Sequence, residues 1–230
     1  MIYKPVSLTE SQIGKYVDIN GDGIPEGVIF ADLAIGADSL WNGTPNTRYR
    51  YEKSSNKLKE YVVVGTYVHP LNGKQEILTP ILDGEDRFYI MALEDVDEHW
   101  CHHWYANVSD MKDFAITTAM DFGSGQKNTL NIIEKWNKED YGAQDSFDIW
   151  NIIKKQVEDG WFVPSIDEWA AFAGQLGITK SNYSSKGLSG WYWSSSQYGT
   201  NSAFSIYLNN GYVDNYGVNG THCVRLAATF

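Results

Sequence analysis

The residues best suited to metal or thiol chemistry lie in one short segment, which contains His99, Cys101, His102 and His103 and two tryptophans. His99 and His103 would share one face of a helix, whereas His99, Cys101 and His103 would share one face of a strand. Zinc sites usually draw four ligands from separated elements, and the sequence has no second pair of Cys or His elsewhere. We therefore expect aromatic packing around these residues, without a metal ion or another cofactor.

A second group of possible ligands begins at Asp18. The spacing of Asp18, Asn20 and Asp22 matches the first half of an EF-hand calcium loop, and Glu26 could contribute a further oxygen. The twelfth position is Ile29, however, and not the bidentate glutamate that an EF-hand needs. A hairpin turn is the favoured interpretation, and a calcium site at these four residues is the less favoured one.

Common catalytic motifs are absent from the sequence, which has no Gly-x-Ser-x-Gly elbow, no phosphate-binding loop and no His-Glu-x-x-His pair. Asp167 and Glu168 are adjacent carboxylates, but neighbours on a helix point to different faces, and Ser165 with Glu168 forms a capping box. Cys101 and Cys223 allow at most one bridge, and separate thiols in a reducing compartment are the favoured interpretation. We expect no enzymatic activity.

Composition indicates a folded chain that does not bind nucleic acid. Of the 230 residues, 43% are hydrophobic and 14% aromatic, which is far from the composition of disordered chains. A formal net charge of −11 and the lack of a basic run argue against a phosphate-backbone partner. No apolar stretch approaches a membrane span, and residues 1–5 lack the apolar region of a secretory signal. Protein, peptide and carbohydrate targets remain.

The elements that must position these residues follow the order strands, helices, strands. Alternating or β-branched runs predict the strands, and apolar residues three or four apart predict the helices. This order favours an α+β fold over a parallel α/β sheet. The sequence predicts a hairpin over 12–35, strands near 61–68 and 87–93, helices near 127–137, 147–157 and 165–176, and β structure after a linker at 181–190.

The last part of the chain has an unusual composition, because 198–230 contains no Lys, Glu, Gln, Trp or Met. Apolar and polar residues alternate over 204–209, and Asn209-Asn210-Gly211 predicts a tight turn. The expected outer surface combines Tyr, Ser, Asn and Gly, as antibody paratopes do, because Tyr gives a large contact area with few rotatable bonds. An ordinary Asn/Gly-rich hairpin would have the same composition, so both interpretations stay open.

Four motifs in the second half of the chain resemble a known family. They are Gly123-Ser124-Gly125-Gln126-Lys127-Asn128-Thr129; Asp159-Gly160-Trp161-Phe162-Val163-Pro164-Ser165 followed by Glu168-Trp169; Gly190-Trp191-Tyr192-Trp193-Ser194-Ser195-Ser196-Gln197; and Val224-Arg225-Leu226. In this order they resemble C-type-lectin-fold domains related to the formylglycine-generating enzymes. More narrowly, they resemble the variable proteins of diversity-generating retroelements, which occur on phage tails and bacterial surfaces. Residues 1–119 add nothing to this resemblance.

The resemblance implies a C-type-lectin-like domain at 120–230 and an N-terminal β-rich part, 1–119, packed on the same domain. It also implies that adenines of a template copy are randomised and written into the 3′ end of the gene. An Asn codon treated in this way can never encode Lys, Glu, Gln, Trp or Met. Those are the five types that the sequence lacks after Gln197.

The resemblance further assigns variation to outward side chains of about 190–224 and constancy to inward ones. Apolar residues would hold the backbone still, and a preorganised surface binds with less entropic loss. The expected ligand-binding residues are Tyr198, Thr200, Asn201, Ser205, Tyr207, Asn209, Tyr212, Asp214, Tyr216, Asn219, Thr221 and His222. The expected inward scaffold is Trp161, Trp169, Trp191, Trp193, Phe204, Ile206, Leu208, Val213 and Val224.

We therefore expect a non-catalytic display protein, on a virion or a bacterial surface, that binds a protein or carbohydrate target. Lectin-type calcium triplets, Glu-Pro-Asn and Trp-Asn-Asp, do not occur in the sequence, which argues against calcium-dependent sugar binding. One alternative is a related oxidase with a copper or thiol centre, which requires the sulfurs of Cys101 and Cys223 to meet. Another is a structural surface module, which an extended apolar patch would favour.

Overall fold

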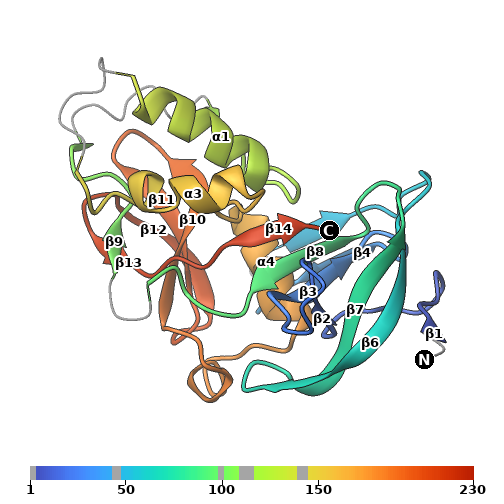
Figure 1. Cartoon of the computed structure of the whole chain (residues 1–230). Helices are drawn as coiled ribbons and strands as arrows, with labels where there is room; N and C mark the ends of the chain where they lie inside the picture. Colours follow the sequence, from blue (N-terminus) through green and yellow to red (C-terminus); the bar gives the residue numbers. More distant parts are fainter. Residues whose placement is uncertain (1–3, 43–47, 98–100, 109–116, 139–144) are drawn as a thin grey trace.

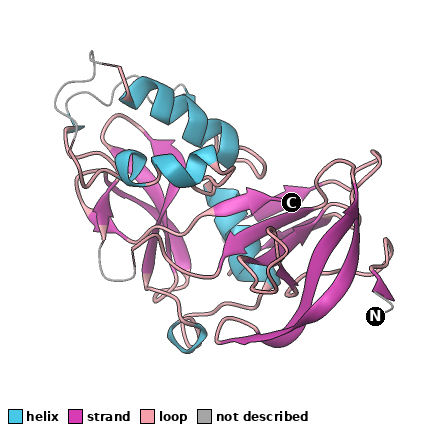
Figure 2. Ribbon diagram, in the orientation of Figure 1, coloured by secondary structure: helices cyan, strands magenta, loops and turns pink. Residues whose placement is uncertain are grey.

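The computed structural model describes residues 4–42, 48–97, 101–108, 117–138 and 145–230, and it has the α+β fold that the element order predicts (Figures 1 and 2). The strands are β1 (Lys4–Pro5), β2 (Tyr16–Val17), β3 (Gly27–Asp32), β4 (Ala37–Leu40), β5 (Arg48–Tyr51), β6 (Glu60–His69), β7 (Gly73–Leu82), β8 (Phe88–Ala92), β9 (His102–His103), β10 (Trp191–Tyr198), β11 (Ser202–Tyr207), β12 (Tyr212–Gly217), β13 (Thr221–His222) and β14 (Ala227–Thr229). The helices are α1 (Gly125–Trp136), α2 (Ile149–Ile152), α3 (Lys154–Glu158) and α4 (Ile166–Gln175), with a 3₁₀ helix, η5 (Ser184–Lys186).

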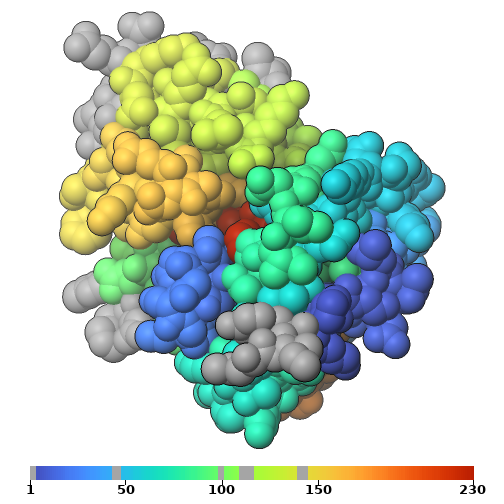
Figure 3. Space-filling view, turned by 45° about the vertical axis from the view of Figure 1, so that its right-hand side comes forward, coloured from blue at the N-terminus to red at the C-terminus, as the bar shows by residue number. Residues whose placement is uncertain are grey.

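Segments from both ends of the chain build one seven-stranded sheet, in the order β1-β6-β7-β2-β3-β8-β14. Its neighbouring strands are antiparallel except for β2 and β7, which run parallel. The last strand, β14, pairs with β8, and Ala228 lies opposite Ile90. Only a small part of this red C-terminal end is visible in the space-filling view, between segments from the rest of the chain (Figure 3).

The local sequence explains most strands of this sheet. The predicted hairpin contains β2 and β3, and Gly21 and Gly23 in its turn have φ angles of 77° and 88°, a region that glycine enters without steric cost. The strands predicted near 61–68 and 87–93 correspond to β6 and β8. The sequence does not predict β7, because Pro80 and four polar residues interrupt its apolar pattern. Pairing with β6 and β2 fixes this strand instead.

Helix α4 lies between the large sheet and a separate three-stranded sheet, β10-β11-β12. Helix α4 contacts β3 and β5 on one side and β10 and β11 on the other (Figure 1). Its predicted capping box is confirmed: Ser165 Oγ accepts a hydrogen bond from Glu168 N at 3.2 Å, and Glu168 Oε2 accepts one from Ser165 N at 2.7 Å. The helix predicted near 147–157 is instead divided into α2 and α3, because Ile153 has a ψ of 1° and leaves the helical conformation.

A buried ion pair connects the C-terminal motif to the three-stranded sheet. Arg225 Nε donates to Asp95 Oδ1 at 2.6 Å, and the hydroxyl of Tyr192 on β10 donates to the same carboxylate at 3.0 Å. Arg225 is 1% exposed, and the carboxylate of Asp95 stabilises its buried charge. Trp169 of α4 stacks on Tyr192 with ring centroids 4.7 Å apart. These contacts hold one face of the sheet against α4.

Candidate ligand-binding site

The three-stranded sheet has one buried face and one face that is partly open. Phe204 and Ile206 of β11 point toward α4 and are 7% and 0% exposed. The alternate residues point the other way, as the period of two in a strand requires. On that second face the strand register places Ser205 between Trp193 of β10 and Asp214 of β12.

A cleft of about 390 Å³ lies on the second face, where the short strand β13 and the loop before it come against the sheet. The imidazole of His222 is surrounded there by aromatic rings. Its centroid lies 4.3 Å from that of Trp193, 4.8 Å from that of Tyr216, 5.7 Å from that of Tyr207 and 6.0 Å from that of Trp191. The residues that line the cleft are Trp191, Tyr207, Tyr216, Asn219, Gly220, Thr221 and His222.

The lining of this cleft is uncharged at neutral pH. Burial lowers the pKa of His222 from its usual 6.5 to about 4, so the imidazole is neutral. His222 Nδ1 and Ser205 Oγ are 2.8 Å apart and share a hydrogen bond. Burial also raises the pKa of Tyr207 to about 12, with smaller contributions from Asp214 and the neighbouring tyrosines. Aromatic faces, amides and hydroxyls thus form the recognition surface.

Most of the predicted ligand-binding residues have side chains that reach solvent. Tyr198, Tyr212 and Tyr216 are 51%, 38% and 48% exposed. Tyr212 and Tyr216 lie on the second face, whereas Tyr198 packs edge to face on Phe204. Tyr207 and Tyr212 stack on each other with centroids 5.2 Å apart. Thr200, Asn201, Asp214, Asn219 and Thr221 are also exposed, and Tyr207 and Asn209 are half-buried.

Three predicted orientations are wrong. Ser205 and His222 are 0% and 3% exposed, although both were expected to point outward, and Trp191 is 46% exposed, although it was expected to point inward. The reason for the burial is a contact between β13 and the second face: His222 packs on Trp193 and Tyr216 and shares a hydrogen bond with Ser205. Trp191 lies on the same face as Tyr207, and its Nε1 donates to Asn209 Oδ1 at 3.0 Å. Trp191 is therefore a residue of the cleft that sequence reasoning assigned to the scaffold.

The other scaffold residues lie inside the protein or near it. Trp169 Nε1 donates to the carbonyl of Trp193 at 3.0 Å, and Trp193 Nε1 donates to the carbonyl of His102 at 2.8 Å. These two bonds connect α4, β10 and β9 in series. Trp169, Trp193, Phe204, Ile206, Leu208 and Val224 are buried, whereas Trp161 and Val213 are half-buried.

Both cysteines are free thiols, and their sulfurs are in contact, which the sequence does not predict. Cys101 Sγ and Cys223 Sγ are 3.4 Å apart, although 122 positions separate the residues in sequence. The sequence gives no signal for this proximity, because it depends on the pairing of β9 with β13. His99 lies outside the described residues. Both ring nitrogens of the buried His102 lack a hydrogen-bond partner within the described part of the chain, and burial lowers the pKa of this histidine.

Aromatic packing near the cysteines agrees with the expectation for this segment. Trp104 packs edge to face on Trp150 with centroids 4.9 Å apart, and its Nε1 donates to the carbonyl of Ser194 at 2.9 Å. His103 Nδ1 lies 3.3 Å from the carbonyl oxygen of Gly220. Histidine and cysteine form no group of three close donors among the residues with described positions.

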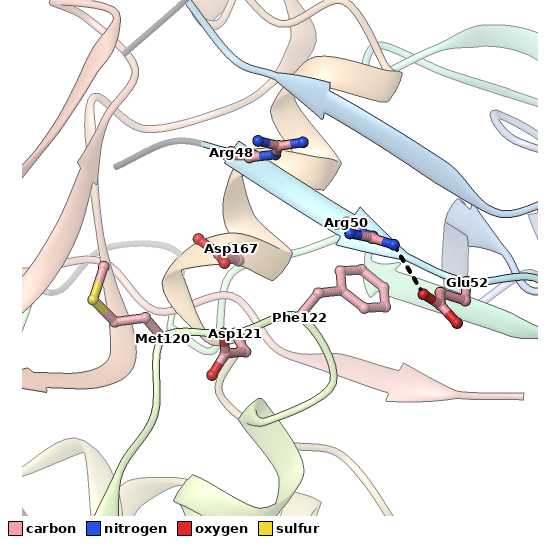
Figure 4. A pocket seen from close by; sticks show the side chains of 7 residues that line it. All are labelled: Arg48, Arg50, Glu52, Met120, Asp121, Phe122 and Asp167. Atoms are coloured by element: carbon pink, nitrogen blue, oxygen red, sulfur yellow. Dashed lines mark hydrogen bonds and ion pairs between the residues drawn. The ribbon is translucent and has the colours of Figure 1, made fainter. Parts of the chain in front are cut away.

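A second cleft, of about 600 Å³, lies between β5 and the start of α4 (Figure 4). Arg48 and Arg50 project from β5 on one side, and Asp167 and Asp121 lie on the other. Burial, reinforced by the charge of Asp121, raises the pKa of Asp167 to about 7. The arginines are already paired, Arg48 with Asp38 at 2.8 Å and Arg50 with Glu52 at 3.0 Å. Because its charges are largely balanced, this cleft does not select a ligand of one sign; the lining is completed by Met120 and Phe122.

The acidic turn between β2 and β3 brings the side-chain oxygens of Asp18, Asp22 and Glu26 within 4.8 Å of one another. Each carboxylate already accepts a backbone N–H of the turn: Gly21 N donates to Asp18 at 2.7 Å and Ile19 N to Glu26 at 2.7 Å. Asn20 accepts a bond from Asp22 N at 2.9 Å. Burial raises the pKa of Glu26. The hairpin turn is confirmed, and this acidic cluster alone identifies no ion.

Comparison with known proteins gives no further identification. No family model, no curated protein and no solved structure matches the chain. Within the described residues, no helix combines the length and apolar character that crossing a membrane requires. The geometry of the site is therefore the main source for a functional conclusion.

Proposed function

We propose that the protein is a non-catalytic binding protein and that the open face of the β10-β11-β12 sheet contacts its target. One observation carries this proposal: Trp191, Tyr212 and Tyr216 are exposed on one face of a sheet whose opposite face is buried against α4. Rigid tyrosines with neighbouring Asn and Thr give a large contact area at low entropic cost. Targets of this kind are proteins or carbohydrates on another cell or particle.

The diversification of this face is part of the proposal. The segment 198–230 lacks the five residue types that a randomised Asn codon cannot encode, and it includes β11, β12 and β13. The fixed residues of the same strands, Phe204 and Ile206, are buried, so substitutions between them would leave the core intact. A C-type-lectin-like fold of the variable-protein subclass, displayed on a phage tail or a bacterial surface, is the family proposal that fits these features.

A display library tests the binding proposal directly. Tyr207, Tyr212, Asp214, Tyr216 and Asn219 would be replaced by Asn codons randomised at their adenines, and the library would be selected against several unrelated purified proteins. A matched library at exposed positions of β6 and β7, for example Thr66, Val68, Lys74 and Ile81, controls for surface position. We expect binders from the first library to be enriched over the control. Equal enrichment, or unfolding of most members of the first library, contradicts the proposal.

The genetic part of the proposal has its own test. We expect a near-copy of the last codons, rich in adenine at the outward positions, beside a reverse-transcriptase gene. If the flanking sequence holds neither, the face can still bind a single target, but diversification by a retroelement is excluded.

A thiol-based oxidase is a second candidate, because the sulfurs of Cys101 and Cys223 meet the distance that it requires. Burial raises the pKa of Cys223 to about 12, however, which disfavours the thiolate that acts as nucleophile or metal ligand. Titration of the reduced protein with copper(I) against a competing chelator separates the two functions. Binding of one ion that requires both cysteines favours the oxidase, and its absence leaves the binding protein.

A further inference from the structure

The contact between Cys101 and Cys223 follows from the register of β9 and β13. These strands are antiparallel, with His222 opposite His102 and Thr221 opposite His103. Continuing the register by one residue places Cys223 directly opposite Cys101. The two sulfurs are 3.4 Å apart at this position.

The backbone hydrogen bonds of Cys223 show whether it forms a hydrogen-bonded or a non-hydrogen-bonded pair with Cys101. Its N–H donates to the carbonyl of Trp191 at 3.1 Å, and its carbonyl accepts from the N–H of Trp193 at 3.1 Å. Both groups therefore point toward β10 and away from Cys101, so the cysteines form a non-hydrogen-bonded pair. In such pairs the Cα atoms lie about 4.5 Å apart, which is within the range that a disulfide spans.

We propose that Cys101 and Cys223 are a reversible redox pair, forming a cross-strand disulfide that clamps β9 to β13 beside the cleft. The observed sulfur distance is that of two thiols in contact, and a bond requires the sulfurs to approach by about 1.4 Å, which rotation of the two side chains provides. The clamp would hold β13, whose His222 packs on Trp193 and shares a hydrogen bond with Ser205. The disulfide is a property of the chain alone, and its formation does not depend on what the cleft binds.

The chemistry balances with a small-molecule disulfide, such as oxidised glutathione, as the oxidant. Cys101 is the more exposed thiol, and its thiolate attacks one sulfur of the oxidant, which releases one thiol and leaves a mixed disulfide. Cys223 then loses its proton and attacks Cys101 Sγ, which releases the second thiol. The two cysteines lose two protons and two electrons, and the oxidant gains them. Burial raises the pKa of Cys223 to about 12, which lowers the fraction of thiolate available for the second step.

The test uses the full chain, treated either with oxidised glutathione or with excess dithiothreitol, then alkylated and weighed intact. We expect two alkyl groups on the reduced protein and none on the oxidised protein. Proteolysis without reductant should release one cross-linked peptide pair that contains Cys101 and Cys223. The melting temperature of the oxidised form should be higher by on the order of 10 °C, because the bond closes a long loop of the unfolded chain.

The variants Cys101→Ser and Cys223→Ser provide the controls, and we expect neither to change its melting temperature on oxidation. Three results would overturn the proposal: both thiols stay open to alkylation after oxidation, glutathione remains attached to Cys101, or the bond joins two copies of the chain. Should a serine variant fail to fold, the peptide map of the unsubstituted protein still decides between these outcomes.

Discussion

The imidazole of His222 lies against the indole of Trp193, with ring centroids 4.3 Å apart and ring planes 29° apart. Trp193 also donates a hydrogen bond to the carbonyl of His102, on the strand that pairs with His222. One tryptophan thus supports both β9 and β13. The floor of the cleft belongs to the framework, and its exposed wall consists of tyrosines, a tryptophan, an asparagine and a threonine.

This contact predicts that His222 is structural although the preceding residue, Thr221, is not. We expect His222→Ala to lower the free energy of unfolding by about 2–3 kcal/mol, because it leaves a cavity between rings and leaves Ser205 Oγ unpaired. The adjacent exposed substitution Thr221→Ala should cost less than about 0.5 kcal/mol. Urea unfolding at pH 7 measures both. If both variants lost an equally small free energy of unfolding, His222 would be a residue of the variable surface and not of the framework.

The pKa of His222 gives a second prediction, on the effect of acid. A histidine whose folded pKa is about 4 and whose unfolded pKa is 6.5 binds fewer protons when folded. Its contribution to stability is therefore complete above pH 6.5 and is lost as the pH falls toward 4, by up to about 3 kcal/mol. The ring proton resonances of His222, followed by NMR, should titrate near pH 4. A midpoint near 6.5 would mean that the ring is hydrated, in conflict with its burial.

A third prediction compares the two faces of the sheet. Phe204→Ala should lower the free energy of unfolding by about 3–5 kcal/mol, because Phe204 is 7% exposed and packs in the main core. Tyr212→Ser should cost less than about 1 kcal/mol, since the side chain is 38% exposed and loses only part of its stacking on Tyr207. Thermal unfolding of the two variants measures both losses of stability. Similar losses would argue against a separate framework and binding surface.

Local signals in the sequence are sufficient for several elements. The start of α4 could be predicted because Ser165 and Glu168 satisfy backbone groups only three residues apart. The β2–β3 hairpin and the turn at 209–211 follow from Asn and Gly, which adopt the backbone angles of tight turns. The inward positions Phe204 and Ile206 follow from strict alternation in one strand.

The remaining features depend on contacts between distant segments. The sequence could not show that β9 pairs with β13, and this pairing brings Cys101 to Cys223. An alternating pattern identifies two faces but cannot show that the side chain of His222, from a distant strand, packs on one of them. The second cleft was missed for the same reason, because Arg50 and Asp167 come from segments more than a hundred residues apart.

The second cleft leads to a fourth prediction. Asp167 has a folded pKa of about 7, above its unfolded value, so the folded protein binds more protons and loses stability as the pH rises from about 4 through 7. Asp167→Asn cannot ionise, and we expect it to exceed the unsubstituted protein in stability by about 1 kcal/mol at pH 8, and to match it near pH 4. Asp159→Asn, at an exposed site, is the control. A difference that does not change with pH would show that the carboxyl is ionised throughout.

The last prediction concerns the buried pair of Arg87 and Asp32, both of which are 0% exposed. Arg87 donates two hydrogen bonds to Asp32, at 2.8 and 2.9 Å, and Asp32 also accepts the N–H of Gln12 at 3.1 Å. Asp32→Ala should therefore lower the free energy of unfolding by about 3–5 kcal/mol, because it leaves an uncompensated buried cation. The double variant Asp32→Ala with Arg87→Met should lose less than the sum of the single losses, by about 2 kcal/mol or more.

The exposed pair of Arg48 and Asp38 is the matched control for this cycle. It has the same bidentate geometry, at 3.0 and 2.8 Å, but its side chains are 59% and 45% exposed. Asp38→Ala should cost far less stability than Asp32→Ala, because solvent screens the exposed pair and hydrates the remaining arginine. Urea unfolding at pH 7 of the two single variants and the double variant of each pair gives both coupling energies. If the exposed and the buried pair showed equal coupling, Arg87 would have to be hydrated in the folded protein, and the N-terminal segment that encloses it would be open.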